Sequence, residues 1–497
     1  MRTSTKTVLY LLAGIAAAAA ICFFLPPLYD SLEQTHISEP SAGYASSGVQ
    51  GQTEAEANVT PLAAVELLVT ACLMWTLPRR FAVCPLLVMI CLMPLGQQLI
   101  LFGLHFPLFR LLLLVGALRI ASRGEAAGLK WTQVDSLFVW WVLASLVFGT
   151  MSEPTLEHFQ NRLGDAYNSA GAYFFVRCVV VDLDDIVIGV RTLAWMSLPI
   201  AALMLVEKAT AHNLLYVFGG VPEWTLERDG HLRCQGAFAH PILAGAFGAT
   251  QLPLFVALWF YRPGDRPLAV LSTVSAIIIA TTASSSGAFL TIFAALGGLA
   301  LWKARRCLAL LRWGALLAIL CLPIVINAPA WFLMARLATV FGGEGAYRSL
   351  LIDQAISHFN EWWLFGTNYT AHWAARELLV SPTMIDIVNQ YVAEGVNGGV
   401  LKLGLFVAII ILCFKGLGRA LRDTPQSAVA AHFIWAIGVS LFTHCFSFIS
   451  VSYWDQLIVV WFWLLASISC LVSIYGLRPV SVPLARNPSW DGASAHS

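Results

Sequence analysis

The sequence contains little charge. Of its 497 residues, 11% are Asp, Glu, Lys or Arg and 58% are hydrophobic, and the mean hydropathy is +0.74. No soluble domain needs so much apolar surface, whereas runs of about 17–25 apolar residues have the length that crosses a hydrocarbon core as a helix. These runs are continuous rather than alternating, which excludes a transmembrane barrel. The sequence therefore predicts an all-α polytopic membrane protein in contact with the lipid bilayer.

Several chemical signatures are also missing. The eleven cysteines lie mostly singly inside apolar runs, so no disulfide framework is indicated. The chain has no C-x-x-C pair, no H-E-x-x-H segment and no phosphate-cradling glycine loop, and we expect neither a metal nor another cofactor. Because the net charge is only +1, bulk electrostatics argue against nucleic acid as a partner.

Positive charge is absent from residues 29–61, a Ser- and Gly-rich segment that we therefore place outside the membrane. Starting from a cytoplasmic N-terminus and a first helix at 8–28, the positive-inside rule gives about fourteen (12–14) transmembrane helices. The acidic turn 182–185 is the weakest point of this topology, because it lacks the positive charge of a cytoplasmic turn. The polar segments 151–169, 207–240 and 328–394 fall on the outer side.

Arginine lies on the expected outer side, where positive charge is statistically disfavoured. Two arginines lie in segment 207–240, and others lie in the large loop 328–394. A guanidinium group grips phosphate or carboxylate through two parallel hydrogen bonds. The alternative is a contact with lipid headgroups or with nearby acidic side chains. Taken as a set, these arginines favour an anion site, and its candidates are Arg228, Arg233, Arg336 and Arg348.

Three groups of motifs between residues 230 and 415 resemble those of the O-antigen ligase and polymerase superfamily. They are Arg233-Cys-Gln-Gly-Ala-Phe-Ala-His-Pro241; Gly345-Ala-Tyr-Arg348 with Trp362-Trp-Leu-Phe-Gly366; and Asn389-Gln-Tyr391 with Glu394-Gly-Val-Asn-Gly-Gly399. The family's ligases place a histidine before the Asn, where this chain has Val388, which favours a polymerase over a ligase. We divide the chain accordingly into N-terminal helices (1–230), a ligase/polymerase-like core (231–415), and a C-terminal helix pair with a cytoplasmic tail (416–497).

The resemblance implies a glycosyltransferase-type polymerase at the periplasmic face of the bacterial inner membrane. It would extend an exopolysaccharide or O-antigen from polyprenyl-diphosphate-linked oligosaccharide repeat units, with chain-length regulators and export proteins as candidate partners. The diphosphate leaving group gains negative charge as the glycosidic bond breaks, and fixed cations stabilise that charge in the transition state. Arg233 and Arg348 are the expected catalytic cations, and Arg228 and Arg336 are expected to bind substrate.

The acceptor hydroxyl must lose a proton, and the candidate acids or bases on the outer side are Asp386, Glu394, His240, His358 and His372. An acid close to a helix start is also favoured by the helix dipole alone, so Glu394 has a structural alternative. The expected sugar ligands are His240, Asn389 and Gln390.

Charged residues inside the expected spans form a further set of candidates. Arg177 and Lys402 would have to face a partner or a cavity, because charge in hydrocarbon is costly, and they are candidates for a diphosphate or lipid path. Two other functions stay open: a ligase that moves a finished glycan to another acceptor, and a transporter or flippase. A transporter favours broken helices, mid-membrane charges and internal repeats, and no clear repeat relates the two halves of this chain.

Overall fold

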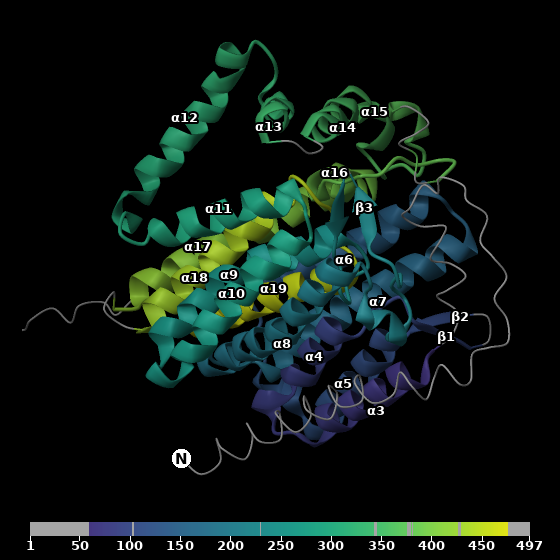
Figure 1. Ribbon diagram of the computed structural model, residues 1–497, viewed down its shortest axis with the longest axis vertical. Coiled ribbons are helices and arrows are strands. Elements are labelled where there is room, and N and C mark those ends of the chain that lie inside the picture. Colours follow the sequence, from purple (N-terminus) through teal and green to yellow (C-terminus); the bar gives the residue numbers. More distant parts are fainter. Residues whose placement is uncertain are drawn as a thin grey trace, which may run out of the picture. The chain divides into compact units, whose positions relative to one another are not determined.

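The computed structural model describes residues 59–101, 104–228, 230–341, 345–374, 379, 381–425 and 429–475. The described chain is mostly helical (Figure 1). The first helix expected at 8–28 and nearly all of the outer loop 29–61 lie outside these residues.

Seven helices in the described ranges are long and apolar enough to cross a membrane. They are α6 (Gln133–Ser152), α8 (Leu183–Thr210), α9 (Pro241–Tyr261), α10 (Arg266–Thr282), α17 (Gly399–Asp423), α18 (Val429–Ser447) and α19 (Asp455–Tyr475). An eighth span results if α12 (Leu308–Ile326) is counted together with the segment after it, from which it is separated by a bend of 79°. The chain is therefore a helical, membrane-embedded protein.

Helices shorter than these seven form in several other segments that the sequence predicted as transmembrane spans. Apolar helices form at α3 (Pro61–Thr76), α4 (Val83–Leu92), α5 (Leu108–Arg123) and α11 (Ser286–Ala300). Two hairpins pair β1 (Gln98–Leu101) with β2 (Leu104–Pro107), and β3 (Leu226–Arg228) with β4 (His231–Arg233). The segment expected as the large outer loop contains α13 (Leu333–Phe341), α14 (Gly345–Ser357), α15 (Phe359–Trp362) and α16 (Gln390–Val396).

The expected polar loop 151–169 is wrong from residue 156 onward, because α7 (Leu156–Val179) is one continuous helix. Thr155 caps its start, and the Thr155 hydroxyl accepts a hydrogen bond from the backbone N–H of His158. The first half of α7 is too polar to stand out in a hydropathy profile.

Helix α9 lies in the core and packs against α8, α10, α11 and α18. Its glycines allow close approach, because a Cβ atom added at Gly248 would lie 2.5 Å from the backbone oxygen of Ala276 on α10. Small residues at helix interfaces are typical of membrane bundles, where close packing drives association. Helices α9, α10, α18 and α19 form a compact group in Figure 1.

One end of the bundle concentrates arginine, and we call it the basic end. Here Arg262 lies 3.1 Å from Asp184, and Arg79 lies 3.8 Å from Asp185. The acidic turn 182–185 therefore meets positive charge from other helices, although it has none of its own. We call the opposite end, where α7, α9, α11, α17 and α19 begin, the loop end.

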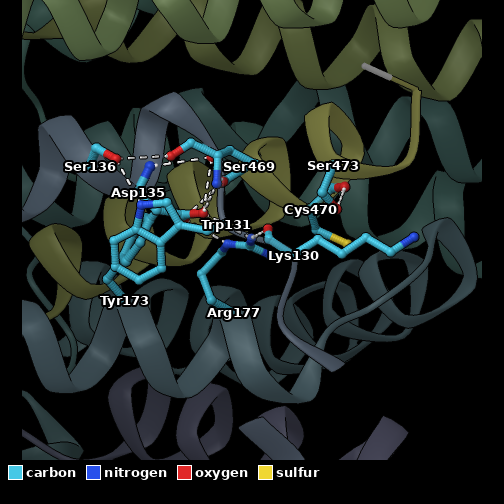
Figure 2. A network of polar contacts seen from close by, with 10 residues as sticks. Lys130, Trp131, Asp135, Ser136, Tyr173, Arg177, Ser469, Cys470 and Ser473 are labelled. Atoms are coloured by element: carbon cyan, nitrogen blue, oxygen red, sulfur yellow. Dashed lines mark hydrogen bonds and ion pairs between the residues drawn. The ribbon is translucent and has the colours of Figure 1, made fainter. Parts of the chain in front are cut away.

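A buried polar network joins α6, α7 and α19 close to the basic end (Figure 2). Arg177 donates to both carboxylate oxygens of Asp135, at 2.8 and 3.0 Å, and to the backbone oxygen of Lys130 at 2.8 Å. Asp135 also accepts from the hydroxyls of Tyr173 at 2.6 Å and Ser469 at 2.9 Å. Arg177 thus joins three helices, and it also lines a separate cavity of about 180 Å³, so its expected place on a substrate path stays a prediction.

Candidate functional site

A cavity of about 580 Å³ opens at the loop end. Its wall is formed by parts of α6, α7, α16, α17 and α19 and by the segment that precedes α16. Four residues expected from the sequence line it: Asp386, Gln390, Glu394 and Lys402. The polar and aromatic side chains around them include Trp141, Arg162, Asp165, Asn168, Asn397, Trp454 and Phe462. Aromatic surface with a few convergent polar groups is typical of a ligand site.

Glu394 is held by side chains from three helices. It is 3% exposed, and its carboxylate accepts hydrogen bonds from Trp141 Nε1 at 2.9 Å and Gln390 Nε2 at 2.7 Å. Lys402 Nζ lies 3.4 Å from Glu394 Oε2 and 5.6 Å from the centroid of the Trp141 ring. Glu394 is the fifth residue of α16, beyond the first turn, so the helix dipole does not explain its position.

Gln390 and Asn389 position this carboxylate. The Gln390 side chain, besides donating to Glu394, accepts from the backbone N–H of Tyr453 at 2.6 Å. Asn389 caps α16 by accepting from the N–H of Val392 at 3.1 Å, and its amide donates to a backbone oxygen in the α18–α19 turn at 3.1 Å. Asn389 therefore anchors the helix that carries Glu394, rather than lining the cavity as a sugar ligand.

The polar face of α7 also lines the cavity and was not predicted from the sequence. Arg162, Asp165 and Asn168 are spaced by three residues and all line the cavity. Arg162 Nη2 donates to Asn397 Oδ1 at 3.3 Å, and Arg162 Nη1 lies 3.8 Å from Asp165. The sequence contained a signal for this face, because Arg162 lies on the expected outer side, as do the four arginines that were named as candidates for an anion site.

Arg233 and Arg348 are not among the residues lining this cavity, but their segments contact one turn, between α10 and α11. The backbone N–H of Cys234, directly after Arg233, donates to the backbone oxygen of Thr282 at 3.2 Å. Arg348 Nη1 lies 3.5 Å from Ser286 Oγ, and the Arg348 side chain is buried. The fold thus brings both arginine-bearing segments to the same turn.

The α18–α19 turn lies between the α10–α11 turn, which both arginine-bearing segments contact, and the cavity. We call this α10–α11 turn the arginine turn. Ser450 packs directly on Gly287, where an added Cβ atom would lie 2.6 Å from Ser450 Oγ. The same turn continues into the cavity wall. On the other side, the Tyr347 hydroxyl, adjacent to Arg348, donates to the backbone oxygen of Asp386.

The remaining expected ligands lie elsewhere and have local roles. Arg336 Nη2 donates to the backbone oxygen of Ile326 at 2.9 Å, at the C-terminal end of α12, where a cation is favoured by the helix dipole. His240 Nδ1 accepts from the N–H of Ile242 at 3.2 Å and so caps α9. Arg228 is exposed at the tip of the β3–β4 hairpin.

Comparison with known proteins gives no match: no family model, no curated protein and no solved structure is similar to this chain.

Proposed function

We propose that this protein polymerises polyprenyl-diphosphate-linked oligosaccharide repeat units into an exopolysaccharide or O-antigen. The observation that carries this proposal is the cavity at the loop end, which is lined by two cations, Arg162 and Lys402, and by four carboxylates: Asp165, Asp386, Glu394 and Asp455. Its volume of about 580 Å³ falls within the usual range for small-molecule sites, about 300–1,000 Å³.

The distribution of arginine supports an orientation with the basic end in the cytoplasm and the loop end in the periplasm of a bacterial inner membrane. In that orientation the cavity and the arginine turn both face the periplasm. The proposal keeps the expectation of about fourteen spans and of a large periplasmic segment at 328–394.

In the proposed reaction, the acceptor hydroxyl oxygen forms a bond to the anomeric carbon of the donor. The bond between that carbon and the diphosphate oxygen breaks, and the electron pair leaves with the diphosphate. Arg233 and Arg348, at the turn contiguous with the cavity, would bind this leaving group. Asp386 would accept the hydroxyl proton, and Glu394 would hold Lys402 beside the glycan. No metal ion is needed in this scheme, because the cations are side chains.

The test is chain growth in a purified system. Protein in detergent or vesicles is incubated with lipid-diphosphate-linked repeat units, and longer glycans are sought by gel electrophoresis and mass spectrometry. Arg233→Ala and Arg348→Ala should each lower the rate about 10²–10³-fold, the usual loss when one electrostatic donor to a transition state is removed. Arg266→Ala is the control, because Arg266 begins α10 at the basic end of the bundle and is not among the residues expected to bind substrate.

Normal polymer from both arginine variants would remove the proposed diphosphate site. Wild-type protein that makes no longer glycan, yet moves labelled substrate across vesicles, would favour a transporter or flippase instead.

A ligase is the second candidate, and one contact disfavours it. Val388, at the position where the family's ligases have a histidine, packs against the hydrophobic cluster that includes Trp362 and Ile385. An aliphatic side chain in that environment offers no proton-transfer group. Supplying a finished glycan with a different acceptor separates the two activities, because only a ligase would join them.

A further inference from the structure

We propose that His358, Glu361 and His372 form a binding site for one divalent transition-metal ion, with Zn²⁺ as the best match. One ligand atom from each of the three side chains lies within 4.8 Å of the others. His358 directly precedes α15, Glu361 lies in α15, and His372 lies in the short helix η8 (Ala371–Trp373). This site is separate from the cavity and does not depend on the proposed function.

The separation between His372 and Glu361 is close to that in a four-coordinate ion, and the ligand atom of His358 lies within 4.8 Å of both. His372 Nε2 lies 3.1 Å from Glu361 Oε1 and 3.0 Å from Oε2. Zinc bonds of about 2.0–2.1 Å to nitrogen and oxygen imply ligand separations of about 3.4 Å in a tetrahedron. A small rotation of the side chains would therefore admit the ion between them, and the fourth position would be left to water.

Backbone and side-chain partners already orient two of the three ligands. His358 Nδ1 lies 3.0 Å from the backbone oxygen of Gln354, and because a carbonyl only accepts, Nδ1 carries the proton. That tautomer leaves Nε2 with a lone pair for a metal. Trp373 Nε1 donates to Glu361 Oε2 at 3.1 Å and fixes the carboxylate. Such outer partners, a backbone carbonyl on a histidine and a donor on a carboxylate, are typical of metal centres.

Aromatic stacking holds the two imidazole rings in place. The His358 ring stacks on Trp373, with centroids 5.5 Å apart and planes 19° apart, and the Tyr369 ring stacks on His372 at 5.1 Å and 17°. Trp373 itself is buried in the hydrophobic cluster beneath. The His372 and Glu361 side chains remain 37% and 30% exposed, so an ion can reach them from solvent.

The ligand set selects the class of ion. Imidazole nitrogen suits Zn²⁺, Cu²⁺, Ni²⁺ and related ions, whereas Ca²⁺ and Mg²⁺ prefer oxygen. Since none of the three residues lines the cavity, the ion would act by joining α15 to η8 rather than by taking part in glycosyl transfer.

The experiment uses the full chain, purified with a tag that contains no histidine and stripped of metal with a chelator. Equilibrium dialysis against Zn²⁺ at near-neutral pH, followed by metal analysis, should give one bound equivalent. Trp373→Phe keeps an aromatic ring, although a smaller one, but removes the N–H bound to Glu361, and should weaken binding about 10–100-fold. His358→Ala and His372→Ala, which each remove a ligand, should weaken it at least as much.

His212→Ala is the matched control. His212 Nε2 lies 3.1 Å from Glu223 Oε1, a second partly exposed His–Glu pair at the loop end that is not part of a three-ligand group in the described chain. This variant should bind Zn²⁺ as the wild type does.

The proposal fails if wild-type protein takes up no stoichiometric Zn²⁺, or if the His358, His372 and His212 variants bind equally. Should an alanine variant misfold, the Co²⁺-loaded wild-type and Trp373→Phe proteins decide the matter. Visible absorption bands of four-coordinate Co²⁺ are expected, and their absence would overturn the assignment. Glycan synthesis enters none of these measurements, so the result is independent of the polymerase proposal.

Discussion

The ion pair between Glu394 and Lys402 gives the sharpest test of the cavity. Lys402→Met removes the ammonium group and keeps a side chain of similar length. Glu394, which is 3% exposed, then retains only neutral donors, Trp141 and Gln390, among the contacts described for its carboxylate. Deleting one partner of a buried pair typically costs about 3–5 kcal/mol, because a charge is left uncompensated.

The separation of the charges gives a similar magnitude. At 3.4 Å, Coulomb's law with an effective dielectric constant of about 20 yields about 5 kcal/mol. The two side chains are only 8% and 3% exposed, so water and salt screen them weakly. The double variant Glu394→Gln/Lys402→Met leaves no unpaired charge. We therefore expect it to be more stable than the sum of the single effects predicts, with a coupling free energy of about 2–4 kcal/mol.

The assay is equilibrium unfolding in mixed detergent micelles, applied to the wild type, both single variants and the double variant. Additive effects, with a coupling below about 0.5 kcal/mol, would refute the assignment of a buried ion pair. The same four proteins are then tested for glycan extension. A folded double variant that extends no glycan would show that the pair serves the reaction, whereas an active one would give it a structural role only.

Three further predictions concern other parts of the fold. Arg177→Met should lower the unfolding midpoint in the same micelle assay, and replacing its buried carboxylate partner as well should recover part of the loss. Gly399→Ala should reduce the folded yield in membranes, because φ is +72° there and the added Cβ would lie 2.3 Å from a backbone oxygen. Burial tends to raise the pKa of Glu361, but hydrogen bonds from His372 and Trp373 outweigh it and leave that pKa below its usual value. A carboxyl group whose pKa is lowered by folding stabilises the folded protein at a pH above its ordinary pKa. This stabilisation is lost as the pH falls through the folded-state pKa. Glu361→Gln, with chelator present, should therefore lower the melting temperature at neutral pH, and this difference from the wild type should shrink as the pH falls below the ordinary pKa of a glutamate.

The apolar helices could be predicted from the sequence because hydropathy alone decides where a chain can cross a membrane. The span expected at 186–206 is α8 at 183–210, and that expected at 241–260 is α9 at 241–261. Errors arise where helices are amphipathic. The first half of α7 is polar, so a hydropathy window places the start of the helix too late, and only the capping residue Thr155 marks its true start.

The candidate site could be predicted only in part. Glu394, Gln390 and Asp386 were identified from local motifs and do line one cavity. Arg336 was expected to bind substrate, but its guanidinium group donates a hydrogen bond to the last residue of α12. The bend of 79° after α12 brings the two together. The cluster of His358, Glu361 and His372 could not be predicted, because ten residues separate Glu361 from His372 in the sequence and only the fold brings them into contact.

Arg177 and Lys402 are both charges inside expected spans, and the sequence does not distinguish them. In the structure they have different ion-pair partners and line different cavities. The Arg177 guanidinium donates hydrogen bonds to both carboxylate oxygens of Asp135 and to a backbone carbonyl, within a network that joins three helices. Lys402 lines the cavity at the loop end, and its ammonium group, which has three N–H donors, lies 3.4 Å from Glu394 Oε2. Such an ammonium can contact a second anion without leaving its first partner. Lys402 therefore lies where an anionic substrate in the loop-end cavity can reach it, whereas Arg177, paired with Asp135, lines a separate cavity of about 180 Å³.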